Sequence, residues 1–224
     1  LEDGTVAVAG VPSGASTGTF EAHELRDGDA GRYGGLGVLR AVAFVNGELR
    51  DAIRGTDAAS QLSLDARLQE CDGTKNKSRV GANAILGISL AAARATASSR
   101  GIPLYRYIAE LSGNSLDPHR FPIPMFNILN GGKHSDSGLS IQEFKLVPSG
   151  VVSYPEQLRA GSEIFHSLKK LLETDRFSTG VGDEGGFAPR LESHAQALEK
   201  INQAISMAGY ESGRQVFLGL DVAA

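Results

Sequence analysis

The sequence contains a single cysteine, Cys71, no tryptophan, and few aromatic residues, which make up 6% of the chain. One cysteine cannot form a disulfide within the chain, which favours a reducing compartment, so we expect a cytoplasmic protein. Cys71 itself is by default a small buried apolar residue. The chain also lacks an initiating methionine and a visible secretory signal, and it stops at Ala224 directly after an apolar run. We therefore expect a piece of a longer polypeptide.

Long apolar runs are absent as well. The most apolar run, Ala84 to Ala93, is too short to span a bilayer and is closed by Arg94, so it predicts a buried helix. Positive charge is not in excess: the formal net charge is -4, and the basic residues neither form a stripe nor alternate with aromatic residues. We expect no membrane span and no nucleic-acid partner. The 224 residues are 41% hydrophobic, enough to bury the core of one large domain or two small ones.

The first half of the chain predicts one strand followed by four helices. Residues 5–11, TVAVAGV, alternate as in a strand with one buried face. Helical periodicity then covers 38–49, a segment ending near Gly73, residues 81–100, and residues 103–111. This order is typical of an α+β unit. The turn-rich segment 113–122 predicts a boundary, giving domains 1–115 and 116–224.

The second half predicts strands at 123–129, 141–147 and 216–220, with two helices between the last two. Both helices begin with a capping-box pattern, Ser153 with Glu156 and Ser193 with Gln196. The first helix carries an apolar stripe, expected to be buried: Leu158, Gly161, Phe165, Leu168 and Leu172. Strands separated by capped helices predict an α/β barrel or a doubly wound sheet.

The segment 181–189, VGDEGGFAP, places the adjacent carboxylates of Asp183 and Glu184 between glycines. Glycines cost conformational entropy on folding unless the backbone needs them, so the segment predicts a constrained loop. We expect Val181 and Phe187 to anchor its ends in apolar packing. Partial desolvation would then raise the pKa of Glu184 toward the range of a general acid. The alternative is a charged surface turn.

Other polar residues cluster where the predicted strands begin or end. Residues 127–134, NILNGGKH, end one strand in a turn that carries His134, Gln142 and Glu143 open the next, and Asp221 ends the last. In an α/β barrel the carboxyl ends of the strands build the active site, so Asp221 and His134 are candidate site residues, and Glu143 could point into the same mouth. Taken singly, an aspartate after a strand is often a helix cap and a loop histidine is usually just exposed.

The glycine-rich loop 12–18, PSGASTG, offers backbone amides and hydroxyls to an anion or a metal, or simply connects two elements. Around Ser16 it fits G-x-S-x-G, the serine-hydrolase elbow. However, Pro12 breaks the direct strand entry that an elbow needs. A phosphate-binding P-loop is excluded because no lysine follows Gly18.

Taken in order and spacing over the whole chain, these stretches resemble the enolase family, the phosphopyruvate hydratases. The matching stretches are PSGASTG (12–18), ELRDGD (24–29), DGTKNKSRVGANAILGISLA (72–91), PLY (103–105), PMFNILNGGKH (124–134), QEF (142–144), GSEIFH (161–166), VGDEGGFAP (181–189) and GLDVA (219–223). The resemblance implies a small α+β domain without its first strand, followed by about the first half of a barrel of irregular strand order. A complete barrel takes about 250 residues.

The activity implied by the resemblance is the reversible, Mg²⁺-dependent conversion of 2-phosphoglycerate to phosphoenolpyruvate and water. Glu184 matches the proton donor, and Glu143 matches a second catalytic carboxylate that also lines the substrate site with Gln142 and His134, the histidine of a mobile loop. The family also implies a homo-oligomer, a dimer or an octamer of dimers, and some members are found secreted or at the cell surface. An enolase-fold protein with only a binding or structural role is the alternative.

For metal binding, the resemblance implies Mg²⁺ at two places. Asp221 matches the first of three carboxylate ligands of one ion, and Ser16 matches a loop serine that ligates the second. Carboxylate and hydroxyl oxygens are hard donors that suit Mg²⁺ better than Zn²⁺. The other two carboxylates and the lysine base are expected after Ala224, since none of the lysines at 75, 77, 133 and 145 matches that base.

Overall fold

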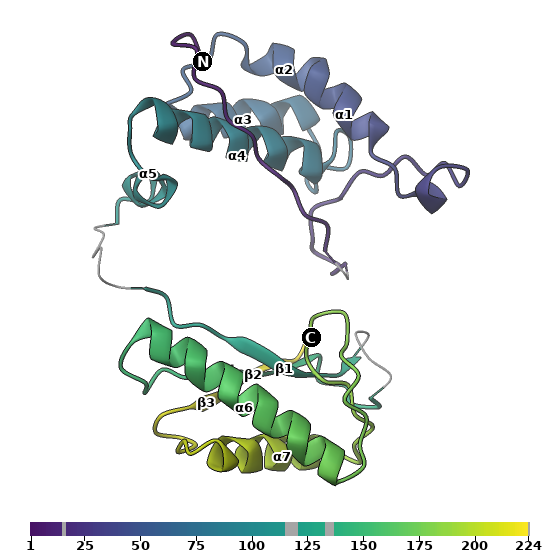
Figure 1. The fold of residues 1–224 in the computed structure, drawn as a ribbon. Helices are drawn as coiled ribbons and strands as arrows, with labels where there is room; N and C mark the ends of the chain where they lie inside the picture. Colours follow the sequence, from purple (N-terminus) through teal and green to yellow (C-terminus); the bar gives the residue numbers. More distant parts are fainter. Residues whose placement is uncertain (15–16, 115–120, 133–136, 224) are drawn as a thin grey trace. The chain divides into compact units, whose positions relative to one another are not determined.

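We describe the protein from a computed structural model that places residues 1–14, 17–114, 121–132 and 137–223. The chain divides into two compact units, Leu1–Asp117 and Pro118–Ala224, and each is described by itself (Figure 1). Two predicted site residues, Ser16 and His134, lie outside the described residues. Within the described ranges, no helix combines the length and apolar character needed to cross a membrane.

The first unit consists of helices. They are the 3₁₀ helix η1 (Tyr33–Gly35) and the α-helices α1 (Leu39–Asn46), α2 (Glu48–Ile53), α3 (Gln61–Asp72), α4 (Ala82–Ser99) and α5 (Leu104–Leu111). The four predicted helical segments are confirmed, but the first is divided into α1 and α2 at Gly47, whose φ of -116° and ψ of -104° are not helical. Helix α3 ends at Gly73, which adopts the left-handed conformation that glycine tolerates best.

The core of the first unit lies between α1, α2, α3 and α4. The buried side chains that pack there include Leu49, Leu64, Leu68, Val80 and Ile85. Fully burying a leucine or isoleucine side chain stabilises the fold by about 1.5–3 kcal/mol, so this cluster holds the four helices together. A smaller cluster around Tyr107 joins α5 to α4.

The strand predicted for residues 5–11 is wrong. This segment is not part of any strand, and the side chains of Val6 and Val8 are 85% and 78% exposed. A strand is stabilised by hydrogen bonds to a neighbouring strand. The described residues of the first unit contain no strand with which residues 5–11 could pair. The alternating pattern alone therefore does not fix a strand here.

The second unit contains a three-stranded sheet built from β1 (Phe126–Asn130), β2 (Glu143–Val147) and β3 (Phe217–Asp221), in that order. The three predicted strands are confirmed. Both pairings are antiparallel, and Glu143 of β2 lies opposite Asn130 of β1 and Asp221 of β3. Because β2 runs against its neighbours, its first residue lies at the same end of the sheet as their last residues.

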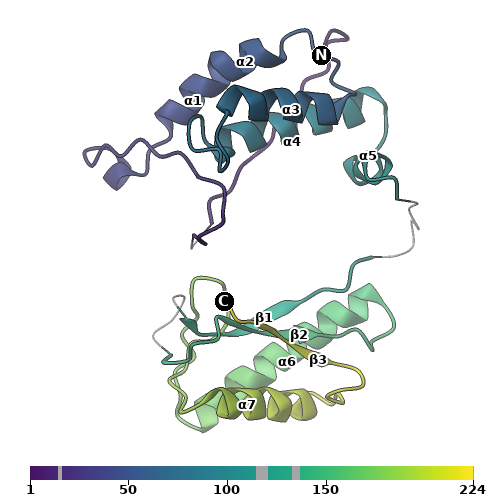
Figure 2. The ribbon, with the colours of Figure 1, turned by 180° about the vertical axis from the view of Figure 1, so that it is seen from behind.

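Two long helices, α6 (Tyr154–Thr174) and α7 (His194–Met207), pack together on one face of this sheet (Figures 1 and 2). Phe144 and Leu146 of β2 are fully buried in the same cluster as Ile164 of α6 and Ile201 of α7. Successive side chains of a strand point to opposite faces. Residues 143 and 145 therefore belong to the face that these helices do not cover.

The apolar stripe predicted for α6 is confirmed at Gly161, Leu168 and Leu172, whereas Leu158 is exposed. Ile164 is buried in its place, so the buried arc of the helix is turned slightly from the predicted one. At Gly161 the helix approaches β1 closely, because a Cβ atom there would lie 2.6 Å from the ring of Phe126.

The two predicted capping boxes differ. Ser193 Oγ accepts a hydrogen bond from the backbone N–H of Gln196 at 3.1 Å, and Gln196 Oε1 accepts one from the N–H of Glu192 at 2.8 Å. This cap is reciprocal, although its second bond reaches one residue beyond the usual donor. The side chain of Ser153 makes no capping bond, so the box predicted at α6 is wrong. Pro155 stands at the start of α6 instead, where its fixed φ suits the first turn.

Candidate functional site

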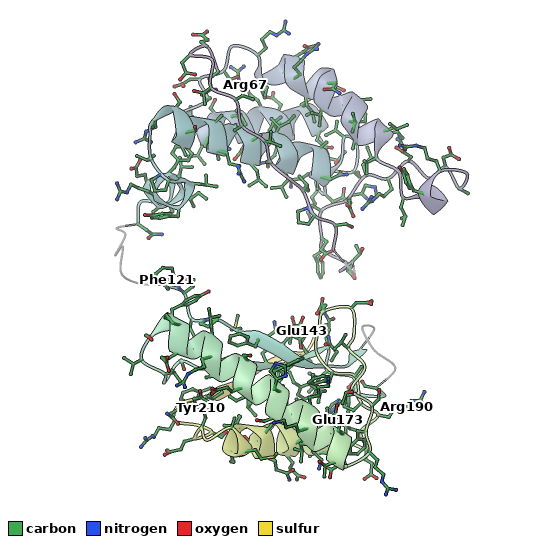
Figure 3. All side chains as sticks on the ribbon, viewed as in Figure 1. Arg67, Phe121, Glu143, Glu173, Arg190 and Tyr210 are labelled. Carbon is green, nitrogen blue, oxygen red and sulfur yellow. The ribbon has the colours of Figure 1, made fainter. Side chains whose placement is uncertain are left out.

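The candidate site lies at the end of the sheet where Glu143 and Asp221 meet, here called the carboxylate rim. The two residues are directly paired across β2 and β3, and directly opposite residues carry their side chains on the same face. That face is the one turned away from α6 and α7 (Figure 3). The Glu143 side chain is 11% exposed, and that of Asp221 is 46% exposed. The structure thus brings together two residues that the sequence predicts for one site.

Lys145 lies on the same face as Glu143, two residues further along β2. Its Nζ atom is 2.5 Å from Oε2 of Glu143 and 3.9 Å from Oδ2 of Asp221. The hydrogen bond to Glu143 raises the pKa of Lys145 against the opposing effect of burial, and the charges of Asp221 and Glu184 act in the same direction. A lysine whose pKa is raised stays protonated at neutral pH, so it supplies positive charge and cannot accept a proton.

Sequence reasoning considered Lys145 only as a residue that does not match the base, and missed its place at the rim. The available sign was its spacing of two from Glu143 within a strand, which puts both side chains on one face. That spacing does not reveal Asp221 as the second partner, since this contact depends on the register between β2 and β3.

The loop that carries Glu184 is a narrow turn. Val181 and Phe187 form an antiparallel bridge at its base, and the N–H of Gly182 donates to the carbonyl of Gly186 at 2.8 Å. The turn is closed by a bond of 3.0 Å from the N–H of Gly185 to the carbonyl of Gly182. Gly185 has a φ of +83°, which a side chain would strain. The constrained loop predicted from the glycines is therefore confirmed.

This loop is fastened to β1 beside the carboxylate rim. The N–H of Phe187 donates to the carbonyl of Ile128 at 3.0 Å, and the N–H of Asn130 donates to the carbonyl of Phe187 at 2.8 Å. A Cβ atom on Gly186 would lie 2.2 Å from Oδ1 of Asn130, so this approach requires glycine. Phe187 is buried and stacks on Phe165 with ring centroids 4.3 Å apart, which confirms it as an anchor.

Two expectations about the loop are wrong. Val181 is 60% exposed and gives no apolar anchor at its end of the loop. Glu184 is exposed at the tip of the turn rather than partly desolvated, because the backbone bonds that hold the loop leave its tip turned toward solvent. The carbonyl of Glu184 accepts a hydrogen bond of 3.4 Å from Nδ2 of Asn127 on β1. The residue therefore remains next to the rim although its side chain is not buried.

Gln142 extends the rim through its backbone. Its N–H donates to the carbonyl of Asp221 at 3.0 Å, and its own carbonyl accepts from the N–H of Gly131 at 2.8 Å. The segment before it is held by His194, the first residue of α7. Its Nε2 lies 3.1 Å from the backbone nitrogen of Ser140 and 3.4 Å from that of Ile141, and accepts from both. Nothing in the sequence pattern pointed to His194.

The glycine-rich loop belongs to the first unit, and its described residues border a cavity there of about 1210 Å³. Ser13, Glu24, Arg26 and Lys77 are among the lining residues, and Ser13 Oγ donates to Glu24 at 2.9 Å. Because Ser16 lies outside the described residues, its assignment as a metal ligand and the serine-hydrolase alternative both stay predictions.

The donor chemistry of Asp221 fits the Mg²⁺ that the resemblance implies. Its carboxylate ends a strand and is about half exposed, with Oδ1 accepting from the N–H of Ala223 at 3.1 Å. In number, however, the donors are too few, because Mg²⁺ takes six oxygen ligands and usually keeps several waters. Within the described parts of the chain, no group of three or more His, Cys, Asp or Glu residues could hold a metal ion.

Comparison with protein-family sequence models gives two matches in tandem. The model described as Enolase, N-terminal domain, matches residues 1–108, and the model described as Enolase, C-terminal TIM barrel domain, matches residues 118–224. The three described strands of the second unit are fewer than the eight that close a TIM barrel, so this unit is an incomplete barrel. Since the two matches together cover nearly the whole chain and agree with the architecture, the chain belongs to the enolase family.

Proposed function

We propose that the polypeptide containing this chain is a Mg²⁺-dependent lyase that interconverts 2-phosphoglycerate with phosphoenolpyruvate and water. The observation that carries the proposal is the convergence of Glu143, Asp221 and the Glu184 loop at one end of the sheet. The family matches over both domains support it. The proposed substrate is a small phosphorylated acid.

The reaction removes a proton from the carbon beside a carboxylate and expels hydroxide, and each step makes a demand on the site. Hydroxide is a poor leaving group, so a carboxylic acid at Glu184 would protonate it as it departs. The first step accumulates negative charge that only concentrated positive charge stabilises. When bound by Asp221 and Ser16, Mg²⁺ would supply that charge. By the family resemblance the base would be a lysine, and none of the lysines at 75, 77, 133 and 145 matches it.

Replacing Glu184 by glutamine in the complete polypeptide tests the assignment of the acid. We expect turnover to fall by about 10²–10⁴ while substrate affinity is retained, because an amide keeps the shape of the side chain but cannot deliver the proton. The rate of enol phosphate formation from 2-phosphoglycerate measures turnover, and a calorimetric titration with a substrate analogue measures affinity.

Asp183→Asn is the matched control, since Asp183 is the neighbouring exposed carboxylate of the same turn and has no proposed role. It should retain nearly full turnover. Wild-type turnover in Glu184→Gln would remove Glu184 from the acid role.

The alternative is an enolase-family protein that binds its ligand without turning it over. Two observations support this alternative. The side chain of Glu184 is exposed, and that of Glu143 already forms an ion pair with Lys145. An unmodified complete polypeptide that binds a phosphorylated acid but forms no enol phosphate with Mg²⁺ present would establish it. The homo-oligomer and the cytoplasmic location stay predictions, checked by sedimentation and by cell fractionation.

A further inference from the structure

The feature that the proposed reaction does not use is Lys145. It lies in the middle strand of the sheet, and its ammonium group is between the two carboxylates of the rim, 2.5 Å from Glu143 and 3.9 Å from Asp221. Its side chain is only 24% exposed. An ion pair in this position is less screened by salt and water than one on the open surface.

The ammonium group is also held in place. The Glu143 side chain is 11% exposed, so moving Lys145 away would remove the cation from a largely buried carboxylate. Separating one partner from a buried charge pair is strongly unfavourable. Because Lys145 alternates with the buried Phe144 and Leu146, the backbone of β2 cannot shift to carry it elsewhere.

A fixed positive charge beside Asp221 has a consequence for any second cation. Like charges repel with an energy that falls only as the inverse of their distance, and the repulsion doubles for a divalent ion. A cation that binds the carboxylate of Asp221 must therefore approach an ammonium group that already faces the same carboxylate.

We infer that Lys145 is the resident cation of the carboxylate rim: it positions Glu143 and lowers the affinity of Asp221 for a divalent cation. Lys145 thus acts as a positioning residue for Glu143, and its charge acts on the neighbouring carboxylate of Asp221. The inference rests on the proposed function in that it takes the incoming ion to be the one this reaction requires.

Calorimetric titration of the complete polypeptide with Mn²⁺ and with Mg²⁺, in the absence of substrate, tests the inference. We expect Lys145→Met to bind either ion about tenfold more tightly, because it keeps the unbranched side chain and removes the charge. Lys145→Gln should also bind the ions more tightly, and it replaces the methionine variant in the test if that variant folds poorly. Lys145→Arg keeps the charge and should stay within about twofold of the unmodified protein.

Two further variants make the measurement specific. Lys200→Met removes the same charge from the same unit, since Lys200 of α7 pairs with Asp175 at 2.5 Å, and it should leave metal affinity unchanged. When Asp221→Asn is combined with Lys145→Met, the increase in metal affinity expected of Lys145→Met should disappear. If Lys145→Met and Lys145→Gln bind metal no more tightly than the unmodified protein, or if the gain survives Asp221→Asn, the inference is wrong.

The same titrations, together with the assay for enol phosphate formation, separate this inference from the proposed function. A protein that forms no enol phosphate but gains metal affinity on removal of Lys145 would contradict the function and support the inference. Normal turnover together with unchanged metal affinity in Lys145→Met would do the reverse. If the unmodified protein shows no metal binding, measurable binding by Lys145→Met supports the inference, and no binding by either protein contradicts it.

Discussion

At the scale of single residues, Asp72 shows how one carboxylate organises a loop. It is the last residue of α3 and is almost completely buried. Its oxygens accept backbone hydrogen bonds from Thr74 at 2.9 Å, Arg79 at 3.1 Å and Val80 at 2.9 Å. Burial acts against the charged form, but the hydrogen bonds from Thr74, Val80 and Arg79 outweigh it and lower the pKa of Asp72.

Replacing Asp72 by asparagine should therefore destabilise the first unit by about 1–3 kcal/mol at neutral pH, since the charged acceptor of several buried donors is lost. The folded-state pKa lies below the unfolded value of about 3.9, so the stabilisation is complete above that value and is lost as the pH falls through the folded-state pKa. The difference between Asp72→Asn and the unmodified protein should shrink in acid.

Denaturant unfolding at pH 7 and at successively lower pH measures this difference. Glu70→Gln on the exposed side of the same helix is the control and should change stability by less than about 0.5 kcal/mol. A difference between Asp72→Asn and the unmodified protein that stays constant down to the acid limit would show that the charge of Asp72 is not what stabilises the loop.

The site residues divide by whether local sequence determines their surroundings. Glu143 and Asp221 were predictable because each begins or ends an apolar strand, and a strand end is a local feature. The role of Lys145 was not, because its contact with Asp221 depends on the pairing of strands 76 residues apart in the chain, from 145 to 221. The exposure of Glu184 was likewise hidden, since it follows from how the loop is fastened to β1.

At the scale of elements, the most informative contact joins α7 to the segment before β2. The Nε2 atom of His194 accepts hydrogen bonds from the N–H groups of Ser140 and Ile141, and its ring lies against Phe144 with centroids 6.3 Å apart. The start of a helix thereby fixes the approach to the carboxylate rim.

We expect His194→Ala to lower the free energy of unfolding of the second unit by about 0.5–1.5 kcal/mol, because the backbone N–H groups of Ser140 and Ile141, which are exposed and half-buried, lose their acceptor. Amide hydrogen exchange at residues 140–142 should accelerate more than exchange elsewhere in the unit. His166→Ala removes an exposed histidine of α6 and serves as the control. Unchanged exchange at Ser140 and Ile141 in His194→Ala would show that the histidine does not hold the segment.

The elements themselves were predictable to different degrees. Helices α3 and α4 were found from apolar spacing and from Gly73 and Gly101, since helical hydrogen bonds are local. The strand expected at 5–11 failed because a strand needs a partner, which a local pattern cannot supply. The antiparallel pairing of β2 was equally invisible, as helices between strands commonly accompany parallel sheets.

At the scale of the whole molecule, the sheet ends in an open strand. Within the described part of the chain, β3 pairs only with β2, and Leu220 on β3 is 47% exposed. The free side of an edge strand presents N–H and C=O groups that can pair with another chain, particularly where apolar side chains accompany them.

The 224-residue polypeptide, produced by itself, should therefore associate in a concentration-dependent and open-ended manner. Leu220→Lys should reduce this association, because a charge on an edge strand opposes pairing. Light scattering over a concentration series measures it, with Val152→Lys as a control at an exposed residue outside the sheet. A monodisperse monomer with one cooperative thermal transition would contradict the prediction.

The antiparallel direction of β2 also indicates where a peptide can be inserted into the chain. Residues 137–142 lead into β2 at the carboxylate rim, whereas residues 148–153 leave it at the opposite end of the sheet. Gly150 is enclosed there, since a Cβ atom would lie 1.9 Å from the carbonyl oxygen of Arg214, but Val152 is fully exposed. A reporter peptide inserted at Val152 would therefore leave the chemistry-bearing end of the sheet untouched.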